Sequence, residues 1–351
     1  GDRRGRLSVL FGSIFLYSAA NLANGLITDL TSYAVLRLVA GIGLAGELGA
    51  GITLVAEIMS RERRGLGTTI VAAFGLLGAV AAGLVGTYDW GLSWQGEPVA
   101  NWRIAYLIGG VLGIGLLLLR IGVVESGMFE QARHHGAPRG DLRQLFGQRR
   151  NLFRYLHCIL IGLPLWFIIG ILIFQSPEFG RAQGQSFPVH APTAIMICYL
   201  GLVVGDVASG LLSQALRSRR AAVLVFLLLC TLVGVYYIEL GPVSSTHFYA
   251  VCFAMGFSVG YWAIFVTIAA EQFGTNLRAT VATTVPNFVR GSVVPLTLAF
   301  ATLRDSVFGG RAAANLDAAL IVLGLSLAIA FTSLYFLEET FGKDLNYVEG
   351  E

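Results

Sequence analysis

The chain has 351 residues, of which 55% are hydrophobic and only 13% are charged. A mean hydropathy of +0.71 excludes an ordinary soluble domain and indicates a protein that crosses a membrane several times. The net charge of +3 lies in short polar stretches that would face anionic lipid headgroups, so we expect no nucleic-acid partner.

Apolar stretches long enough to span a bilayer recur along the whole chain. Because a transmembrane helix needs about 20 apolar residues, we predict ten spans, near residues 7–27, 33–58, 66–87, 102–124, 154–175, 193–216, 221–240, 246–270, 279–303 and 314–337. Most of the arginines lie in the turns on one side of these spans. By the positive-inside rule that side is cytoplasmic, and both ends of the chain lie on it.

The second span carries one carboxylate near its middle, Glu47. Gly43 and Gly51 lie about one turn away on the same face, so the acid lies on a strip without bulky side chains. An ionisable group at this depth costs roughly 2.5–3.5 kcal/mol on insertion scales, so we expect Glu47 to face a cavity or a partner. It is a candidate proton carrier, because a buried carboxyl can be neutral in one conformation and charged in another. The alternative is a glutamate that hydrogen-bonds a neighbouring helix for packing.

Charged residues repeat at a constant offset between the two halves of the chain. Four pairs are each 214 positions apart: Arg6 and Arg220, Glu57 and Glu271, Arg64 and Arg278, and Glu125 and Glu339. This register predicts a duplicated helical bundle.

The repeat also predicts the domain organisation. Two spans precede the second basic turn and none precedes the first, so we expect two N-terminal spans to be absent from this sequence and twelve in the intact protein. We predict an N-terminal bundle at 1–124 without its first two helices, a cytoplasmic linker at 125–153 and a six-helix bundle at 154–351.

Several motifs resemble the major facilitator superfamily, in particular its sugar-porter and metabolite:proton symporter branches. GDRRGR at 1–6 resembles the loop motif after the second helix, and GLLSQALRSRR at 210–220 resembles its copy in the second half, with Gln214 where an aspartate is usual. The other matching residues are Arg37, Gly41, Gly43, Glu57, Arg64 and Gly65, then Glu125 and Ser126, then Glu339, Thr340, Gly342 and Lys343, with Glu338 in place of a proline. The resemblance implies an all-α membrane fold of two pseudo-symmetric bundles and secondary transport by alternating access.

A first group of candidate residues is charged and lies at the cytoplasmic ends of the predicted helices. Acids there can form charge-assisted bonds with arginines of neighbouring turns. The resemblance implies that such bonds lock an outward-facing state and break when the halves rock; the alternative is topology signals and surface pairs of little energy. The group consists of Asp2, Arg6, Glu57, Arg64, Glu125, Arg220, Glu271, Arg278 and Glu339.

A second group consists of charges deep in the membrane: Glu47, Asp206 and Arg290. An arginine at this depth stays charged and requires a counter-charge. Arg290 either pairs permanently with Asp206, or faces the cavity and binds an anionic substrate group while Asp206 or Glu47 carries the coupling proton. Asn287 lies on the same helical face as Arg290. Arg37, which resembles the family's fourth-helix arginine, is a lesser candidate.

Aromatic residues form a third group: Trp166, Tyr261 and Trp262. By the offset of 214, Tyr261 stands where Glu47 stands in the other half, so both positions could face the cavity. An aromatic ring with a polar handle suits a solute with an apolar body, although core or lipid-interface aromatics are the commoner case.

The sequence contains no motif for catalysis, for a nucleotide or for a metal. It lacks G-x-S-x-G, H-E-x-x-H and G-x-x-x-x-G-K, and the cysteines within the spans have no metal-ligand spacing and are expected to be packing residues. We therefore expect a protein that is not an enzyme and that needs no cofactor or metal. The cysteines are Cys158, Cys198, Cys230 and Cys252.

The function these residues favour is proton-coupled symport of a small organic solute across the bacterial inner membrane, by a monomer. Arg290 favours an anionic metabolite over a neutral sugar. The alternatives are a proton-driven exporter of amphipathic compounds, a neutral sugar porter, or a membrane receptor or scaffold on the same fold. A receptor would have little reason to keep the deep charges in hydrocarbon.

Overall fold

The computed structural model describes residues 6–58, 64–94, 97–119, 142–309, 311 and 313–343. Within these ranges only the backbone is described at 6–10, 46–58, 64–73, 94, 142–144, 275, 276 and 279. The chain divides into two compact units. Unit 1 contains Gly1–Val71 and Leu84–Gly140, and unit 2 contains Ala72–Gly83 and Asp141–Glu351.

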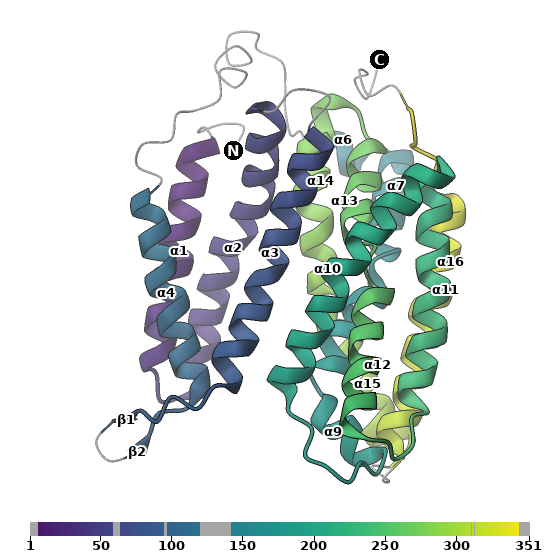
Figure 1. Ribbon diagram of the computed structural model, residues 1–351. Coiled ribbons are helices and arrows are strands. Elements are labelled where there is room, and N and C mark those ends of the chain that lie inside the picture. Colours follow the sequence, from purple (N-terminus) through teal and green to yellow (C-terminus); the bar gives the residue numbers. More distant parts are fainter. Residues whose placement is uncertain are drawn as a thin grey trace. The chain divides into compact units, whose positions relative to one another are not determined.

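In unit 1, α1 leads into α2, and a small hairpin precedes α4 (Figure 1). Helix α1 packs against both α2 and α4, and a small antiparallel hairpin, β1 with β2, pairs Ser93 with Pro98. The bounds are α1 Arg6–Leu26, α2 Leu30–Ile58, α3 Arg64–Thr87, of which 72–83 belong to unit 2, β1 Ser93–Trp94, β2 Glu97–Pro98 and α4 Asn101–Leu119.

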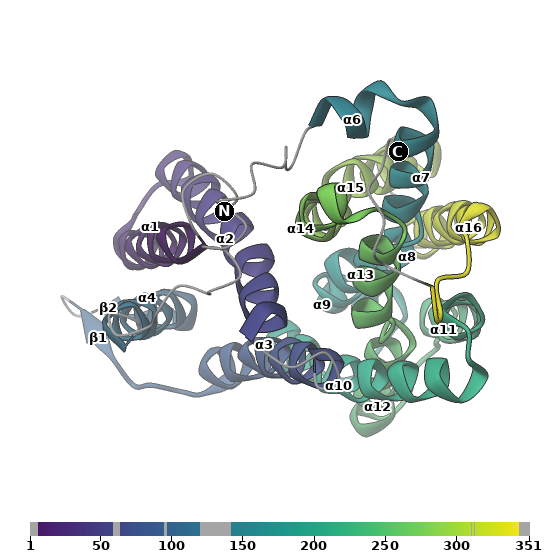
Figure 2. The same ribbon diagram turned by 90° about the horizontal axis from the view of Figure 1, so that it is seen from above.

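Unit 2 is a larger helical bundle, in which α10 packs along α12, and α11 lies between α12 and α16 (Figure 2). Its elements are α6 Leu142–Gly147, α7 Arg149–Leu160, α8 Leu163–Phe167, the π-helical turn η2 Ile168–Ile173, α9 Ser176–Ala182, α10 Ala191–Leu216, α11 Arg219–Ile238, α12 Ser245–Ser258, α13 Trp262–Glu271, α14 Thr275–Gly291, α15 Val293–Thr302, the π-helical turn η3 Leu303–Val307 and α16 Ala314–Phe336.

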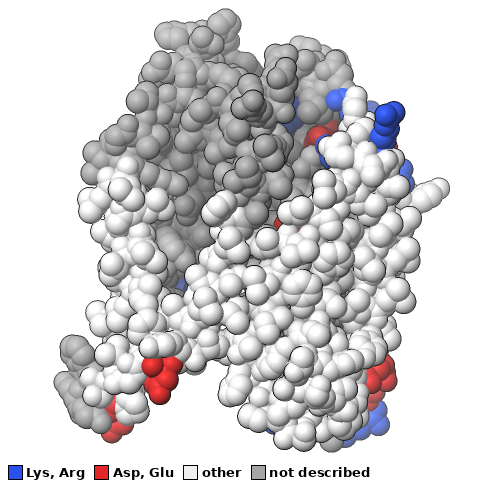
Figure 3. Space-filling model, in the orientation of Figure 1, with Lys and Arg blue, Asp and Glu red and all other residues white. Residues whose placement is uncertain are grey.

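Each of the ten predicted spans overlaps a helical segment, and residues 120–124 of the fourth span lie outside the described residues. Six helices among the described residues are long and apolar enough to cross a membrane, and 30–45 and 74–87 form shorter apolar helices. On the face of the molecule seen in Figure 3, the coloured charged groups gather toward the two ends of the helices of unit 2, with a largely uncharged surface between them. The expectation of ten spans out of twelve stays a prediction.

The helix that contains the fifth predicted span begins more than one turn before residue 154. Helix α7 begins at Arg149, and α6 precedes it, so the last part of the predicted linker is helical. Hydropathy marks only the apolar part of a helix, whereas backbone hydrogen bonding continues through polar residues that lie outside hydrocarbon.

Three predicted spans are broken rather than continuous. The break between α7 and α8 lies at Ile161 and Gly162, that between α12 and α13 at 259–261, and that between α14 and α15 at Ser292. Broken helices expose backbone groups in the membrane interior, which membrane proteins tolerate where protein covers them or where they line a cavity.

Glycines let α10 approach the broken pair α12 and α13 closely. A Cβ on Gly256 would lie 2.6 Å from the carbonyl carbon of Cys198, and a Cβ on Gly260 would lie 2.6 Å from the backbone nitrogen of Asp206. The four cysteines are free and buried, as predicted for packing residues. This close contact fixes Asp206 against the break between α12 and α13.

Candidate functional site

Asp206 lies in the interior of unit 2, with 4% of its surface exposed. One carboxylate oxygen accepts a hydrogen bond from the backbone N–H of Ala263 at 3.1 Å, and the other is buried without a hydrogen-bond partner among the described residues. Ala263 lies in the first turn of α13, where the helix dipole favours a negative charge. The acid is therefore held at a helix N-terminus and keeps one unsatisfied oxygen.

Arg290 lies in the last turn of α14 and is partly buried against two tryptophans. Its guanidinium carbon is 5.3 Å from the ring centroid of Trp262 and 6.0 Å from that of Trp166. The two indoles meet edge to face, with centroids 6.3 Å apart. Cation–π contacts of this kind stabilise a guanidinium but leave its N–H donors open.

The two alternatives for Arg290 differ in its relation to Asp206. Both side chains are described, and neither an ion pair nor a hydrogen bond joins them within the described residues. The permanent bridge is thus not the arrangement of this structure. Arg290 instead belongs to an aromatic cluster with Trp166 and Trp262.

Asn287 and Arg290 share the partly buried face of α14, as predicted. The side-chain amide of Asn287 donates to the carbonyl of Thr283 at 2.9 Å, while Val285 and Val289 are buried on another face. Pro286 also lies inside this helix. Thr283, Asn287 and Arg290 therefore lie on one stripe of α14.

Tyr261 is fully buried, and its hydroxyl donates to the carbonyl of Ile161 at 3.0 Å. This carbonyl lies at the break between α7 and α8, so the tyrosine satisfies a backbone group that the break leaves open. The geometry favours the packing alternative for Tyr261 over contact with a solute.

The candidates of unit 1 are less completely described. Glu47 lies on α2, but its side chain is outside the described residues. Arg37 lies on the same helix and is exposed. Near it in sequence, the hydroxyls of Tyr33 and Tyr106 lie 3.2 Å apart and join α2 to α4.

The charged residues predicted at the cytoplasmic helix ends are likewise described less completely in unit 1 than in unit 2. Asp2 and Glu125 lie outside the described residues, and only the backbone is described for Arg6, Glu57 and Arg64, which are all helical. In unit 2, by contrast, the corresponding residues gather at the end of the bundle where α11 begins and α16 ends.

Glu339 is the centre of this group, which we call the C-terminal clasp: Ser218, Arg219, Glu271, Glu339 and Thr340. The carboxylate of Glu339 accepts hydrogen bonds from the Ser218 hydroxyl and from the backbone N–H groups of Arg219 and Thr340, each at 2.9 Å for the backbone donors. Burial raises its pKa, but the hydrogen bonds from Ser218 and from backbone N–H groups outweigh burial, so the pKa of Glu339 is below its ordinary value. The segment after α16 is thereby fastened to the start of α11.

Glu271 joins the end of α13 to the same clasp. It pairs with Arg219 at 3.4 Å and accepts a hydrogen bond from the Thr340 hydroxyl at 2.7 Å. Arg220 donates from its side chain to the carbonyl of Tyr335 at 3.1 Å and from its backbone N–H to Glu339 at 3.2 Å. The side chain of Arg278 donates to the carbonyl of Phe273 at 3.3 Å.

Sequence reasoning missed Ser218, Arg219 and Thr340 in the clasp. Ser218 precedes α11 and accepts a hydrogen bond from the N–H of Ala221 at 3.0 Å, which is the signature of an N-cap. A serine just before a helical pattern was therefore a signal available in the sequence. The choice of Arg219 over Arg220 depends on helix rotation, which the repeat does not fix.

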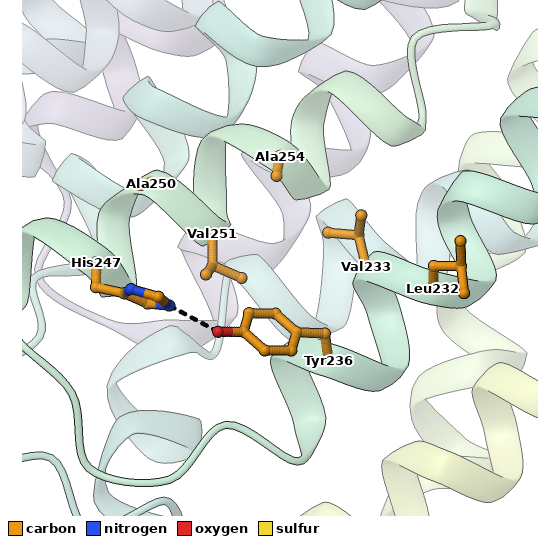
Figure 4. Close-up of a pocket in the computed structure, with 7 residues that line it drawn as sticks. All are labelled: Leu232, Val233, Tyr236, His247, Ala250, Val251 and Ala254. Atoms are coloured by element: carbon orange, nitrogen blue, oxygen red, sulfur yellow. Dashed lines mark hydrogen bonds between the residues drawn. The ribbon is translucent and has the colours of Figure 1, made fainter.

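A surface groove of 420 Å³ lies apart from all these residues, between α11 and α12 (Figure 4). The hydroxyl of Tyr236 and Nε2 of His247 lie 2.8 Å apart at one end of it. Its lining is otherwise apolar, and none of the predicted site residues belongs to it: Leu232, Val233, Tyr236, His247, Ala250, Val251 and Ala254.

The comparisons with known proteins agree with this fold. Residues 1–294 match the family model described as the Major Facilitator Superfamily. The crystal structure of D-xylose-proton symporter superposes with a TM-score of 0.68 at 15% identity, over 98% of this chain and 83% of that one. This likeness confirms the predicted all-helical fold class.

Two curated proteins are similar in sequence. The "Probable 4-methylmuconolactone transporter" of Cupriavidus pinatubonensis is 28% identical over 281 residues, which cover 80% of this chain and 64% of that protein. The "Niacin transporter NiaP" of Acinetobacter baylyi is 26% identical over 306 residues, which cover 79% and 67%. The chain thus spans about two thirds of the length of the curated relatives it matches.

Proposed function

Because the chain belongs to the Major Facilitator Superfamily, we propose that it carries a small organic anion across the membrane by alternating access, as a secondary transporter coupled to protons. The observation that carries this proposal is the state of Arg290. Its guanidinium rests on two indoles and has no carboxylate partner among the described residues. An anionic solute supplies the counter-charge that a buried arginine requires.

The names of the two relatives support the same substrate class. Niacin and 4-methylmuconolactone are small ring compounds that bear a carboxylate, and the proteins that carry these names are 26% and 28% identical to this chain. We propose a solute of this kind for this chain, and not a neutral sugar.

Asp206 is the described candidate for the coupling proton, with Glu47 as the second. A carboxyl with one buried unsatisfied oxygen can take up a proton when the site is closed and release it when water enters. Its hydrogen bond to α13 links this change to the helix that carries Trp262. Protonation of Asp206 and binding of the solute can in this way be coupled through the first turn of α13.

The C-terminal clasp is proposed to hold one end of unit 2 together in one state of the cycle and to open in the other. This proposal includes cytoplasmic ends for the chain, a position in the inner membrane and a monomeric carrier. Ion pairs with good geometry at a helix end stabilise one arrangement without fixing it permanently.

The test is uptake of labelled niacin and benzoate into proteoliposomes that contain the full-length protein, with an imposed proton gradient. We expect accumulation in the wild type and none with Arg290→Gln. With Asp206→Asn we expect exchange of solute to continue and gradient-driven accumulation to stop. Accumulation that survives Arg290→Gln would contradict the proposal that Arg290 binds the anion.

The same vesicles distinguish the rival functions. Export of amphipathic cations that survives Arg290→Gln would favour an exporter. Uptake of neutral hexoses and not of carboxylates would favour a sugar porter. Binding of a solute without any flux would favour a receptor.

A further inference from the structure

The indole N–H of Trp166 is an unsatisfied donor in unit 2. Nε1 is buried and has no hydrogen-bond partner in the part of the chain that the structure describes. By contrast, Nε1 of Trp90 donates to the carbonyl of Val85 at 3.0 Å. Buried donors are rarely left unpaired because their desolvation is then uncompensated, so this group requires an explanation.

This donor lies on the ring that Arg290 contacts. The guanidinium carbon is 6.0 Å from the centroid of the Trp166 ring, so the ring that carries the unsatisfied N–H also contacts a group of N–H donors. Neither side chain has a protein acceptor among the described residues. A single carboxylate supplies acceptors for both, because it has two oxygens with several lone-pair directions.

The surroundings of these donors are flat and aromatic. Trp166 and Trp262 meet at an interplanar angle of 77°, and the guanidinium plane adds a third planar group. A solute with an aliphatic body would use the donors alone. A planar aromatic body would also gain stacking or edge-to-face contact with the indoles.

We propose that the indole N–H of Trp166 is the second donor to the carboxylate of the solute, beside Arg290, and that the site selects planar aromatic monocarboxylates. The inference rests on the proposed function, in which Arg290 binds the anion. It adds a specificity-determining residue and a narrower substrate class.

The test compares two variants that replace an indole by a phenyl ring against Arg290. Trp166→Phe removes the buried unsatisfied N–H, whereas Trp262→Phe is the matched control because its N–H is not such a donor. Dissociation constants would be measured for benzoate, 4-hydroxybenzoate and niacin in detergent. We expect Trp166→Phe to raise the Kd for benzoate roughly ten- to a hundredfold, as for loss of one hydrogen bond to a charged group, and Trp262→Phe to raise it less.

A spectroscopic measurement on the wild type covers the case in which Trp166→Phe does not fold. The chain has five tryptophans, so a protein labelled with 15N in the indoles gives few resonances. Benzoate should move the resonance of Trp166 downfield, and Arg290→Gln should abolish that shift. Trp166→Tyr identifies the resonance of Trp166, because that resonance disappears from the spectrum of this variant.

The outcomes separate this inference from the function on which it rests. Suppose that Arg290→Gln abolishes benzoate binding, while Trp166→Phe does not change it and benzoate does not move the indole resonance. Trp166 is then refuted as the second donor, and the binding of the anion by Arg290 stands. If aliphatic anions bind and the three aromatic ones do not, the substrate class is wrong. If Arg290→Gln changes the binding of no anion, the proposed function fails and this inference fails with it.

Discussion

Replacing Gly256 by alanine tests the contact that holds Asp206 in place. The new Cβ would lie 2.6 Å from the carbonyl carbon and 3.0 Å from the Cα of Cys198, whereas carbon atoms pack at about 3.5–4.0 Å. Since these are backbone atoms, and the carbonyl oxygen of Cys198 would lie nearer still, α10 and α12 would have to separate by at least about 1 Å. Overpacking of this kind costs about 1–3 kcal/mol, and the rigid backbone favours the upper part of that range.

The control is Gly210→Ala on α10. A Cβ there meets nothing within 4 Å, so it removes the flexibility of glycine without a clash. This change should be neutral or stabilise the helix by about 0.5–1 kcal/mol. The two variants, which alter the same chemical group in the same helix pair, should therefore shift stability in opposite directions.

The assay is thermal unfolding in detergent, followed by solute binding. For a unit of this size about 1 kcal/mol corresponds to roughly 2–4 °C in Tm. Separation of the helices would also lengthen the 3.1 Å hydrogen bond between Asp206 and Ala263, so proton-driven uptake should fall in Gly256→Ala. A Gly256→Ala protein as stable as Gly210→Ala would refute the reasoning.

Two further predictions concern groups whose hydrogen bonds are described. Tyr261→Phe removes the bond to Ile161 and should lower stability by about 1–2 kcal/mol, with no change in the Kd for benzoate; a large change in Kd would restore Tyr261 as a solute contact. Glu339→Gln should lower stability above pH 5 by about 0.5–1 kcal/mol, because the site is partly exposed. The pKa of Glu339 is lowered in the folded state, so its contribution is present above the unfolded value of 4.5 and is lost as pH falls through the folded value. Thermal unfolding between pH 3 and pH 7 should show that loss in the wild type and not in Glu339→Gln, and equal pH profiles would contradict it.

Hydropathy and small-residue patterns predict the helical segments because both depend on local sequence. Gly201 and Gly205 lie one turn apart on α10, a spacing typical of close helix packing, and both meet the backbone of a neighbouring helix. The breaks at 259–261 and at Ser292 were not predicted, because a helix breaks there only when neighbouring elements satisfy the backbone.

The sequence pointed to candidate residues such as Arg290 and Trp166, but it did not predict which of them touch. Arg290 and Trp166 are far apart in sequence, so no spacing rule could reveal that they touch. A permanent pair with Asp206 was one of the two alternatives for Arg290, because opposite charges in a membrane usually pair. The structure shows instead that α13 supplies the partner of Asp206 and that the indoles surround Arg290.

In the C-terminal clasp, too, the sequence pointed to the right region but not to the residue that makes the contact. The offset of 214 placed Glu271, Glu339 and Arg220 in one group, and the two acids lie at one end of unit 2. The side chain that pairs with Glu271 is that of Arg219, which was not in the group. Neighbouring residues on a helix point about 100° apart, so a repeat alone cannot decide between them.

The most direct test of the central claim is ligand-induced thermal stabilisation of the full-length protein and of Arg290→Gln. The panel would contain aromatic carboxylates, aliphatic carboxylates, phosphates, sugars and cationic drugs. A ligand at a hundredfold excess over its Kd stabilises the folded state by about 2.7 kcal/mol. The account predicts that aromatic carboxylates stabilise the wild type and leave Arg290→Gln unchanged. Equal stabilisation of both proteins, or stabilisation of the wild type by sugars or drugs alone, would contradict it.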